Sequence, residues 1–325
     1  GANVKLMPVR VFRIRLPTEG PTIGEATIAE AIEWAVDHGA DVINLSLGDV
    51  SCSSVENKCQ QPGPVLREAL EYAHDRGVVV VAAAGNNFGA VVFPANYRTT
   101  IAVGAVAPDV SSKNDSYGVR YSKAGYSASG DELDLMAPGG AGGSRDGDCK
   151  LNPVGLKAGG SVTCAEAGTS FATPHVSGVI AMMIAKYRSL GFDYGPDDLR
   201  LILQITATDM GEEGWDRQTG YGLINAHAAV TAGVPVIFAG SRHADALEAA
   251  HVPVRSQLGG VFRLTGVPEG VWTLYGWVDA DGSGTLNPGD FFQEYGQVRV
   301  AKGRPLSGIR LELSRYDGEE LAVRW

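Results

Sequence analysis

The chain has 325 residues and a net charge of −10, from 27 Lys and Arg against 37 Asp and Glu. This balance argues against a nucleic-acid-binding protein, because phosphate contacts need clustered Lys and Arg. A hydrophobic content of 44% excludes wholesale disorder, and no apolar run reaches the roughly 18 residues that a membrane span needs. The length and composition therefore predict a globular protein of about two domains.

Residues 1–233 show the pattern of an α/β domain. Amphipathic helical segments that end in Gly, such as the one that stops at Gly39, alternate with short and wholly apolar runs. Strands that are apolar on both faces predict a parallel sheet that is covered on both sides. The predicted strands are Val9–Ile14, Asp41–Leu45, Val78–Ala83 and Thr100–Val106, and the predicted helices are Ile23–His38, Pro64–Asp75 and Thr169–Leu190.

The pattern changes after Gly233, and residues 234–325 predict a second domain. Short alternating runs are separated there by Gly- and Pro-rich turns, which is typical of a small antiparallel β-sandwich. The predicted strands are Val261–Leu264, Trp272–Val278, Gln297–Val300 and Ile309–Leu313.

Four cysteines form two close pairs in sequence, Cys52 with Cys59 and Cys149 with Cys164. Each pair flanks a polar stretch and lacks the CxxC spacing of a metal site. We predict two disulfides that close short loops in a secreted, extracellular protein. The alternative is free thiols in a cytoplasmic protein.

One segment, Gly168–Gly178, has the residues of a nucleophile turn. Small residues place Ser170 at the start of a long apolar helix, and Pro174 lies in its first turn, where a missing N–H costs little. Unpaired N–H groups and the positive end of the helix dipole favour a developing oxyanion there. Taken alone, Ser170 is also explained as a helix cap.

The Gly168–Gly178 segment resembles the nucleophile motif of the subtilisin-like serine proteases, the subtilases. Further segments resemble that family in the expected order, and the resemblance extends from residue 1 to about residue 230. They are Val42–Gly48, Val79–Asn86, Phe93–Ala95 with Ile101–Val106, Met136–Gly139 and Gly220–Asn225.

The resemblance implies a serine endopeptidase with an α/β, parallel-sheet catalytic domain. It assigns Ser170 as the acyl-forming nucleophile, and it assigns the Asn86 side chain with the Ser170 N–H as the oxyanion donors. The strand exit Ser46-Leu47-Gly48 would pair with the substrate backbone. Without the resemblance, Asn86 is a turn residue and Ser46–Gly48 a tight strand exit. The other residues implied in substrate binding are Ala83, Ala84, Gly85 and Thr169.

The sequence departs from the family in one respect that affects catalysis. A serine nucleophile needs a base and an orienting carboxylate, which the family supplies upstream in Asp-Ser/Thr-Gly and His-Gly-Thr-His motifs, and neither motif is present. Gly1–Val11 resembles the strand that follows the catalytic histidine. We therefore expect an N-terminally incomplete catalytic domain that is inactive alone. Either an N-terminal fragment that carries Asp and His is its partner, or the sequence is an incomplete record of a longer gene.

The six histidines offer no replacement base. His38 and His74 lie at predicted helix ends, and His175 is five residues beyond Ser170, about 140° around the helix. The remaining three, near the predicted domain junction, show no pairing. They are His227, His243 and His251.

A second motif, within residues 279–290, has the spacing of a calcium loop. Oxygen-bearing side chains occupy positions 1, 3, 5, 9 and 12, with Gly284 at position 6, and such an array can surround a hard cation. Strand-like flanks distinguish it from an EF-hand, and an acidic hairpin without metal is the alternative. The candidate ligands are Asp279, Asp281, Ser283, Thr285, Asn287 and Asp290.

Two other functions remain to be weighed against the protease. One is a secreted, non-catalytic binding protein derived from a subtilase. The other is a hydrolase of a different fold, for which Asp209, Asp216 and His227 follow Ser170, but no Gly-x-Ser-x-Gly elbow is present. The Gly-rich run Gly139–Gly143 carries no Lys and predicts a flexible loop instead of a nucleotide site.

Overall fold

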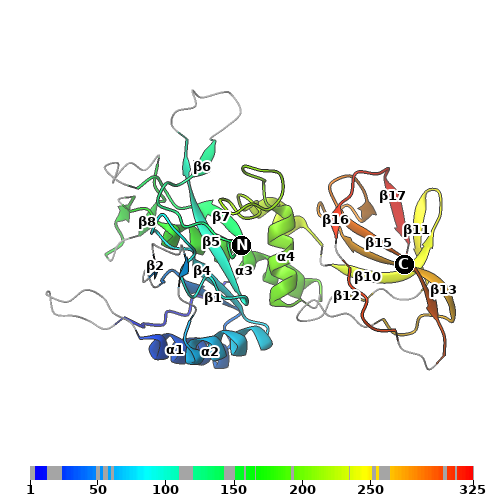
Figure 1. Cartoon of the computed structure of the whole chain (residues 1–325), viewed down its shortest axis with the longest axis horizontal. Coiled ribbons are helices and arrows are strands. Elements are labelled where there is room, and N and C mark those ends of the chain that lie inside the picture. Colours follow the sequence, from blue (N-terminus) through cyan, green and yellow to red (C-terminus); the bar gives the residue numbers. More distant parts are fainter. Residues whose placement is uncertain are drawn as a thin grey trace. The chain divides into compact units, whose positions relative to one another are not determined.

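A computed structural model divides the chain into two compact units (Figure 1). Unit 1 comprises residues 1–185 and 207–224, and unit 2 comprises residues 186–206 and 225–325. The structure describes residues 4–12, 24–48, 52–53, 58–59, 62–109, 120–142, 151–156, 159–164, 166–191, 194–233, 235–250, 254–255, 264–302, 306–311 and 313–324. Parts of the predicted features lie outside them, namely residues 13–14, Ile23, Gly143, Cys149, His251, residues 261–263, Glu312 and the side chains of Cys52 and Cys59.

Four parallel strands form the sheet of unit 1. β1 (Val42–Leu45) pairs with β4 (Val79–Ala83), β4 with β5 (Thr100–Pro108), and β5 with β7 (Leu135–Pro138). β6 (Tyr121–Lys123) joins the far end of β5 in the antiparallel sense. Every residue of β4 is buried, as expected for a central strand covered on both faces. The predicted parallel-sheet α/β domain is confirmed.

Two helices, α1 (Glu25–Asp37) and α2 (Pro64–Asp75), lie side by side and share one hydrophobic core with β1 and β4 (Figure 1). Apolar residues at helical spacing form the buried face of each helix. Both helices end where the sequence predicts, before Gly39 (φ +82°) and Gly77 (φ +77°), in a conformation that Gly adopts without strain.

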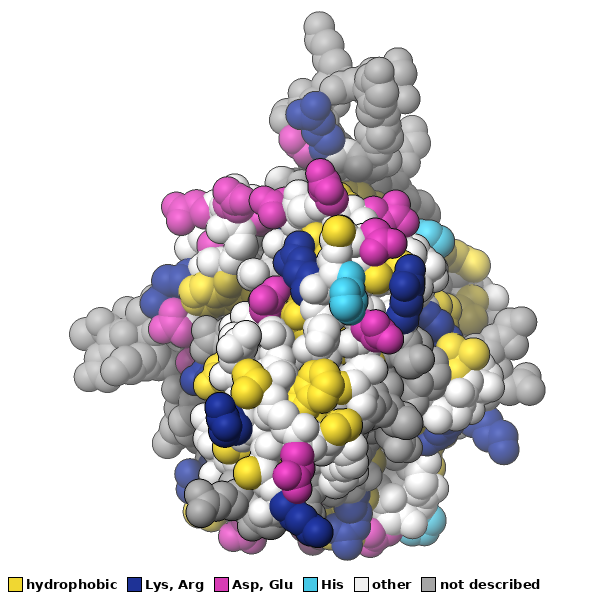
Figure 2. All heavy atoms as spheres, turned by 90° about the vertical axis from the view of Figure 1, so that its right-hand side faces the viewer, with side chains coloured by type: hydrophobic (Ala, Val, Ile, Leu, Met, Phe, Trp, Pro, Cys, Tyr) yellow, Lys and Arg dark blue, Asp and Glu magenta, His cyan; other side chains and the backbone are white. Residues whose placement is uncertain are grey.

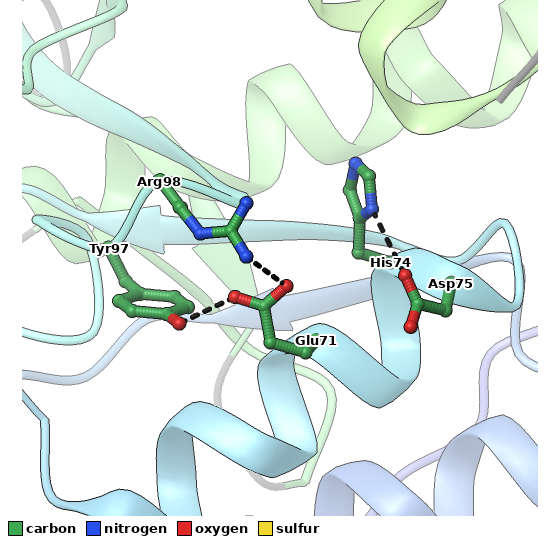
Figure 3. A network of polar contacts seen from close by, with 5 residues as sticks. All are labelled: Glu71, His74, Asp75, Tyr97 and Arg98. Atoms are coloured by element: carbon green, nitrogen blue, oxygen red, sulfur yellow. Dashed lines mark hydrogen bonds and ion pairs between the residues drawn. The ribbon is translucent and has the colours of Figure 1, made fainter. Parts of the chain in front are cut away.

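Polar contacts join α2 to the turn that precedes β5 (Figure 3). Glu71 accepts a hydrogen bond of 2.5 Å from the Tyr97 hydroxyl and pairs with the Arg98 guanidinium at 2.7 Å. His74 lies near the end of the same helix, 3.9 Å from its neighbour Asp75. The contacts of Glu71 hold the turn against the helix. His74 lies in the last turn of α2, at the helix end that the sequence predicted.

Two short hairpins lie in the loops of unit 1. β2 (Cys52–Ser53) pairs with β3 (Lys58–Cys59) in a register that sets Cys52 opposite Cys59. β8 (Gly155–Leu156) pairs with β9 (Val162–Thr163). Cys164, directly after β9, is disulfide-bonded. Shortly after it the chain enters the long helix α3 (Thr169–Ser189).

The first apolar run does not form the buried strand that was predicted at Val9–Ile14. Residues 4–12 have no strand partner in the described part of the chain, and the side chains of Val9 and Phe12 are exposed. An apolar run indicates that a segment can be buried, but a strand also needs a neighbouring edge with which its backbone can pair. No described strand offers that edge to residues 4–12.

Unit 2 contains two short helices and an all-β region, as the sequence predicted for its C-terminal part. The strands form one curled eight-stranded sheet, not two separate layers, and Phe238, Tyr275 and Phe292 pack in its core. The elements are α4 (Pro196–Thr206), α5 (Ala226–Thr231), β10 (Val236–Arg242), β11 (Ala246–Ala249), β12 (Val254–Arg255), β13 (Gly270–Val278), β14 (Thr285–Leu286), β15 (Phe291–Val300), β16 (Ser314–Arg315) and β17 (Leu321–Arg324).

Two predicted strands, Trp272–Val278 and Gln297–Val300, fall within β13 and β15. A third, Ile309–Leu313, is not a strand in its described residues. Its apolar side chains instead lie over a glycine of β13, where a Cβ on Gly276 would come within 2.8 Å of the Leu313 side chain. The apolar pattern there reflects burial of side chains without backbone pairing.

The surface of the described residues carries charges of both signs (Figure 2). Over these residues, no helix combines the length and apolar character that crossing a bilayer requires. On the face drawn in Figure 2, Lys and Arg side chains alternate with Asp and Glu and do not gather into one patch. That face lacks the basic stripe typical of a nucleic-acid site.

Candidate active site

Three loops that carry predicted site residues leave the same edge of the parallel sheet. Ser46–Gly48 follows β1, Gly85 and Asn86 follow β4, and Gly139 follows β7. The sheet order β1, β4, β5, β7 sets these loops in that sequence along the edge, where sites of open α/β sheets lie. The start of α3 contacts all three of them.

Ser170 is the second residue of α3, as the motif predicted. The turn before it is fixed by hydrogen bonds from the Gly168 N–H to Gly139 O (2.9 Å) and from the Phe171 N–H to Gly168 O (3.0 Å). Thr169 is fully buried, whereas Ser170 is only partly buried. The Ser170 hydroxyl therefore lies at the positive end of a 21-residue helix, with access to a substrate.

The side-chain amide of Asn86 is held in one orientation by Thr169. Asn86 Oδ1 accepts hydrogen bonds from the Thr169 N–H (2.9 Å) and from Thr169 Oγ1 (3.0 Å). With Oδ1 engaged in this way, the amide nitrogen Nδ2 is free to donate elsewhere. A Cβ added to Gly168 would lie 3.2 Å from Nδ2, so Gly168 packs closely on the Asn86 amide. The structure thus brings Asn86 and Ser170 to the same turn.

Thr169 was predicted as a substrate-binding residue, and the structure places its side chain beneath the site. Its hydroxyl donates to Asn86 and accepts a hydrogen bond of 3.2 Å from the buried Gly85 N–H. Gly85 has φ +116°, a conformation that favours glycine. Thr169 therefore connects the exit of β4 to the start of α3.

We expect Thr169→Val to lower the free energy of unfolding by about 1–3 kcal/mol, because the buried Gly85 N–H loses its acceptor while the side-chain volume is kept. Urea denaturation measures this difference. Thr169→Ser, which keeps the hydroxyl, is the matched control and should lose less. Equal stability of the Val variant and the unmodified protein would show that the hydroxyl has no structural role.

The exit of β1 is tied to α3 through Ser46 and through two side chains not identified from the sequence, those of Asn44 and Ser177. Ser46 Oγ donates to the backbone O of Ser170 (2.8 Å) and accepts from Asn44 Nδ2 (2.9 Å), and Ser177 Oγ donates to Asn44 Oδ1 (3.0 Å). Two signals could have pointed to them. Asn44 is the polar residue in an apolar strand, and Ser177 lies two helical turns after Ser170.

The predicted substrate strand and pocket wall lie close together in the structure. A Cβ on Gly48 would come within 2.6 Å of the Val92 side chain, and one on Gly85 within 3.0 Å of the same residue. The approach of Val92 therefore leaves no room for a Cβ at position 48, whereas at position 85 the contact is tight and the positive φ favours glycine. Ala83 and Ala84, at the end of β4, are buried.

Within the described part of the chain, no histidine hydrogen-bonds to Ser170. His175 is exposed, and its Nδ1 lies 2.9 Å from Phe171 O on its own helix. His38 is stacked on Trp34 at the end of α1.

The predicted calcium loop lies in unit 2, where it joins β13 to β15. Ligand oxygens of Asp279, Asp281 and Asp290 lie within 4.8 Å of one another. Asp290 is buried, and it accepts hydrogen bonds from Trp277 Nε1 (2.9 Å) and from the Ala280 N–H (2.8 Å). Three carboxylates this close repel one another, and a divalent cation would remove that repulsion.

Burial raises the pKa of Asp290 and the pKa of Asp279, and the neighbouring Asp281 raises the latter further. Asn287 Nδ2 donates to Ser283 Oγ (2.7 Å) inside the loop. The Thr285 hydroxyl donates to Glu320 (3.1 Å), and the Thr285 backbone O accepts from Ser283 Oγ. Both the backbone O and the hydroxyl of Thr285 therefore lie within hydrogen-bond distance of Ser283 Oγ, at 3.1 Å and 3.3 Å.

The sequence model of the Subtilase family matches residues 2–222. The chain is 33% identical over 242 residues to fervidolysin from Fervidobacterium pennivorans, which covers 72% of this chain and 32% of that protein. It is 34% identical over 226 residues to subtilisin DY from Bacillus licheniformis, which covers 68% of both. The chain thus spans about a third of the length of fervidolysin.

A solved structure, the prenylagaramide maturation protease PagA, is similar with a TM-score of 0.51 at 26% identity, over 66% of this chain and 70% of that one. The family match includes the turn of Ser170 together with the loops of Asn86 and Ser46–Gly48. This chain therefore belongs to the subtilase family of subtilisin-like serine proteases.

Proposed function

We propose that the protein is a serine endopeptidase in which Ser170 forms the acyl-enzyme. Ser170 Oγ attacks the carbonyl carbon, a base takes the hydroxyl proton and gives it to the leaving amine, and water then hydrolyses the ester. Asn86 Nδ2 and the Ser170 N–H stabilise the oxyanion. The observation that carries the proposal is the double hydrogen bond by which Thr169 orients the Asn86 amide beside the start of α3.

The substrate in this proposal is an extended peptide that adds a strand along Ser46–Gly48. The hydrogen bond from Ser46 to the Ser170 backbone supports it, because this contact sets the distance between that strand and the nucleophile. We assign the base and the orienting carboxylate to a separate segment that binds this chain. An N-terminal fragment of the same protein is the candidate for that segment.

The proposal is tested on the protein produced from its gene, with and without Ser170→Ala. Incubation with a fluorophosphonate followed by peptide mapping should place the label on Ser170, and the same preparation should hydrolyse casein. The Ala variant should do neither. Hydrolysis that persists in the Ala variant, or a label on another residue, would contradict the proposal.

A second candidate function, a secreted non-catalytic binding protein, rests on the lack of a base near Ser170 in the described residues. It predicts that the protein binds peptides along Ser46–Gly48 without cleaving them. Ser170→Ala would then change neither binding nor turnover. Labelling of Ser170 by the fluorophosphonate would exclude this alternative.

We further propose that the loop 279–290 binds calcium, with Asp279 and Asp281 as direct ligands and Asp290 as the buried residue that orders the loop. The closeness of the three carboxylates supports this role. The other proposed donors are Ser283 Oγ, the backbone O of Thr285 and Asn287 Oδ1.

Calcium at about 100 times its dissociation constant is expected to raise the stability of unit 2 by about 2.7 kcal/mol, and EDTA should remove the gain. Differential scanning calorimetry detects it as a shift of one transition. Asp281→Asn should abolish the shift, whereas Glu319→Gln, which changes an exposed acid of the same unit, should leave it intact. A shift that survives Asp281→Asn would place the ion elsewhere.

Secretion, the two disulfides and a domain boundary near residue 233 are likewise proposals. The register that sets Cys52 opposite Cys59 supports the first pair, and the disulfide-bonded state of Cys164 supports a second with Cys149. Peptide mapping without reduction should recover the two linked pairs. Recovery of all four cysteines as free thiols would favour a reducing compartment.

A further inference from the structure

Tyr126, in the segment between β6 and β7, contacts two loops of the candidate active site. Its backbone O accepts a hydrogen bond of 3.2 Å from the Phe88 N–H, two residues after Asn86. Its half-buried side chain places the hydroxyl 2.9 Å from Gly139 O and 2.8 Å from Gly140 O. A single residue therefore bridges the loop of Asn86 and the loop that leaves β7.

The loop that leaves β7 is bonded in turn to the turn of the nucleophile. Gly139 O accepts a second hydrogen bond, from the Gly168 N–H (2.9 Å), two residues before Ser170. The Gly139 N–H donates to Val106 O of β5 (2.9 Å). This end of the Gly-rich run, which the sequence predicted to be a flexible loop, is therefore held to the sheet. A continuous set of hydrogen bonds leads from Tyr126 to the start of α3.

The Tyr126 hydroxyl remains a donor because it stays protonated. Burial raises the pKa of Tyr126, and the nearby Gly168 N–H lowers this pKa by less. A hydroxyl carries one proton, so Gly139 O and Gly140 O share it. Both glycines are buried, and among the described residues Gly140 O has no other hydrogen-bond donor. Loss of the hydroxyl would leave that buried carbonyl unpaired, which favours a shift of the loop.

Two contacts relate the loop of Asn86 to the turn of Ser170, and together they fix its orientation. Thr169 holds the Asn86 side chain directly, through its N–H and its hydroxyl. Tyr126 holds the backbone of the same loop two residues further on. The first contact alone would fix a distance and leave the loop free to turn about it. Two oxyanion donors, Asn86 Nδ2 and the Ser170 N–H, must point at one oxygen, so this orientation affects catalysis.

We propose that Tyr126 is a positioning residue for the oxyanion site, whose hydroxyl sets the turn of Ser170 relative to the Asn86 amide. The inference rests on the proposed peptidase function and adds a residue to it. Tyr126 acts through Gly139 and not by contact with the reacting atoms. Removal of the hydroxyl should therefore lower kcat and leave KM nearly unchanged, because the oxyanion forms only in the transition state.

The test is a double-mutant cycle on the protein produced from its gene, with steady-state hydrolysis of one peptide anilide. Tyr126→Phe keeps the ring and the backbone contact with Phe88 and removes only the hydroxyl. We expect it to lower kcat by about tenfold, less than the loss of a direct oxyanion donor. In a protein that already carries Asn86→Ala, the same substitution should lower kcat by less than about threefold, because only one donor remains and there is no pair to align.

Tyr187→Phe is the matched control, because it removes a buried hydroxyl that donates to Ala232 O (3.2 Å) in unit 2, and it should leave kcat unchanged. An equal loss of kcat with and without Asn86, no loss in Tyr126→Phe, or unfolding of that variant at the assay temperature assigns the hydroxyl to folding alone. Each of these results overturns the inference and leaves the peptidase proposal standing. Hydrolysis that is absent, or that survives Ser170→Ala, overturns both.

Discussion

A preparation of these 325 residues alone is expected to hydrolyse a peptide anilide at least about 10⁴-fold more slowly than a subtilisin with its full catalytic set. In subtilisin, a relative, removal of a single catalytic residue lowers kcat by a factor of about 3 × 10⁴ to about 2 × 10⁶. The factor of about 10⁴ expected here is carried over from those measurements. The physical reason is that no histidine among the described residues hydrogen-bonds to Ser170, so none of them is placed to take its hydroxyl proton.

The effect of Ser170→Ala distinguishes a missing catalytic base from misfolding of the protein. Catalytic residues of this type act as a unit, so Ser170→Ala in the 325-residue preparation should lower the residual rate by less than about threefold. The same substitution in a preparation that also contains the proposed fragment with Asp and His should lower the rate by about 10⁶. Initial rates with active-site titration measure both. A large loss in the first preparation would reveal a base within these residues.

The helices of unit 1 were predictable where the spacing of apolar residues agreed with the residues that begin and end a helix. α2 has the predicted bounds, because apolar spacing, an initial Pro and Gly77 all indicate the same segment. Val9–Ile14 and Ile309–Leu313 were predicted wrongly for one reason. Apolar sequence indicates that side chains can be buried, but strand formation depends on a partner edge that the local sequence does not specify.

The residues of the candidate site were predictable from motifs, but the contacts between them were not. Ser170 and Asn86 come together as the ordered motifs implied. The hydrogen bonds of Asn44 and Ser177 join side chains 133 positions apart in the chain, and only the packing of α3 against the exit of β1 brings them together. The role of Thr169 in orienting Asn86 likewise depends on the approach of two segments.

In a preparation that hydrolyses peptides, Asn86→Ala is expected to lower kcat by about 10²–10³, with little change in KM. The size is the value measured for the equivalent donor in subtilisin and is carried over from that relative. The effect falls on kcat because the oxyanion forms only in the transition state, so the amide contributes little to binding the ground state. Steady-state kinetics with one peptide anilide separates the two constants.

The geometry around Thr169 supplies the control for this experiment. Asn86→Ala also removes the acceptor of the buried Thr169 N–H, so it should reduce stability as well as activity. Asn86→Asp keeps an oxygen acceptor for Thr169 but replaces the donating nitrogen with a negative charge. It should therefore preserve more stability than Ala and lose at least as much kcat. An Asp variant that retained full kcat would show that Asn86 acts through folding alone, because a carboxylate cannot donate to an oxyanion.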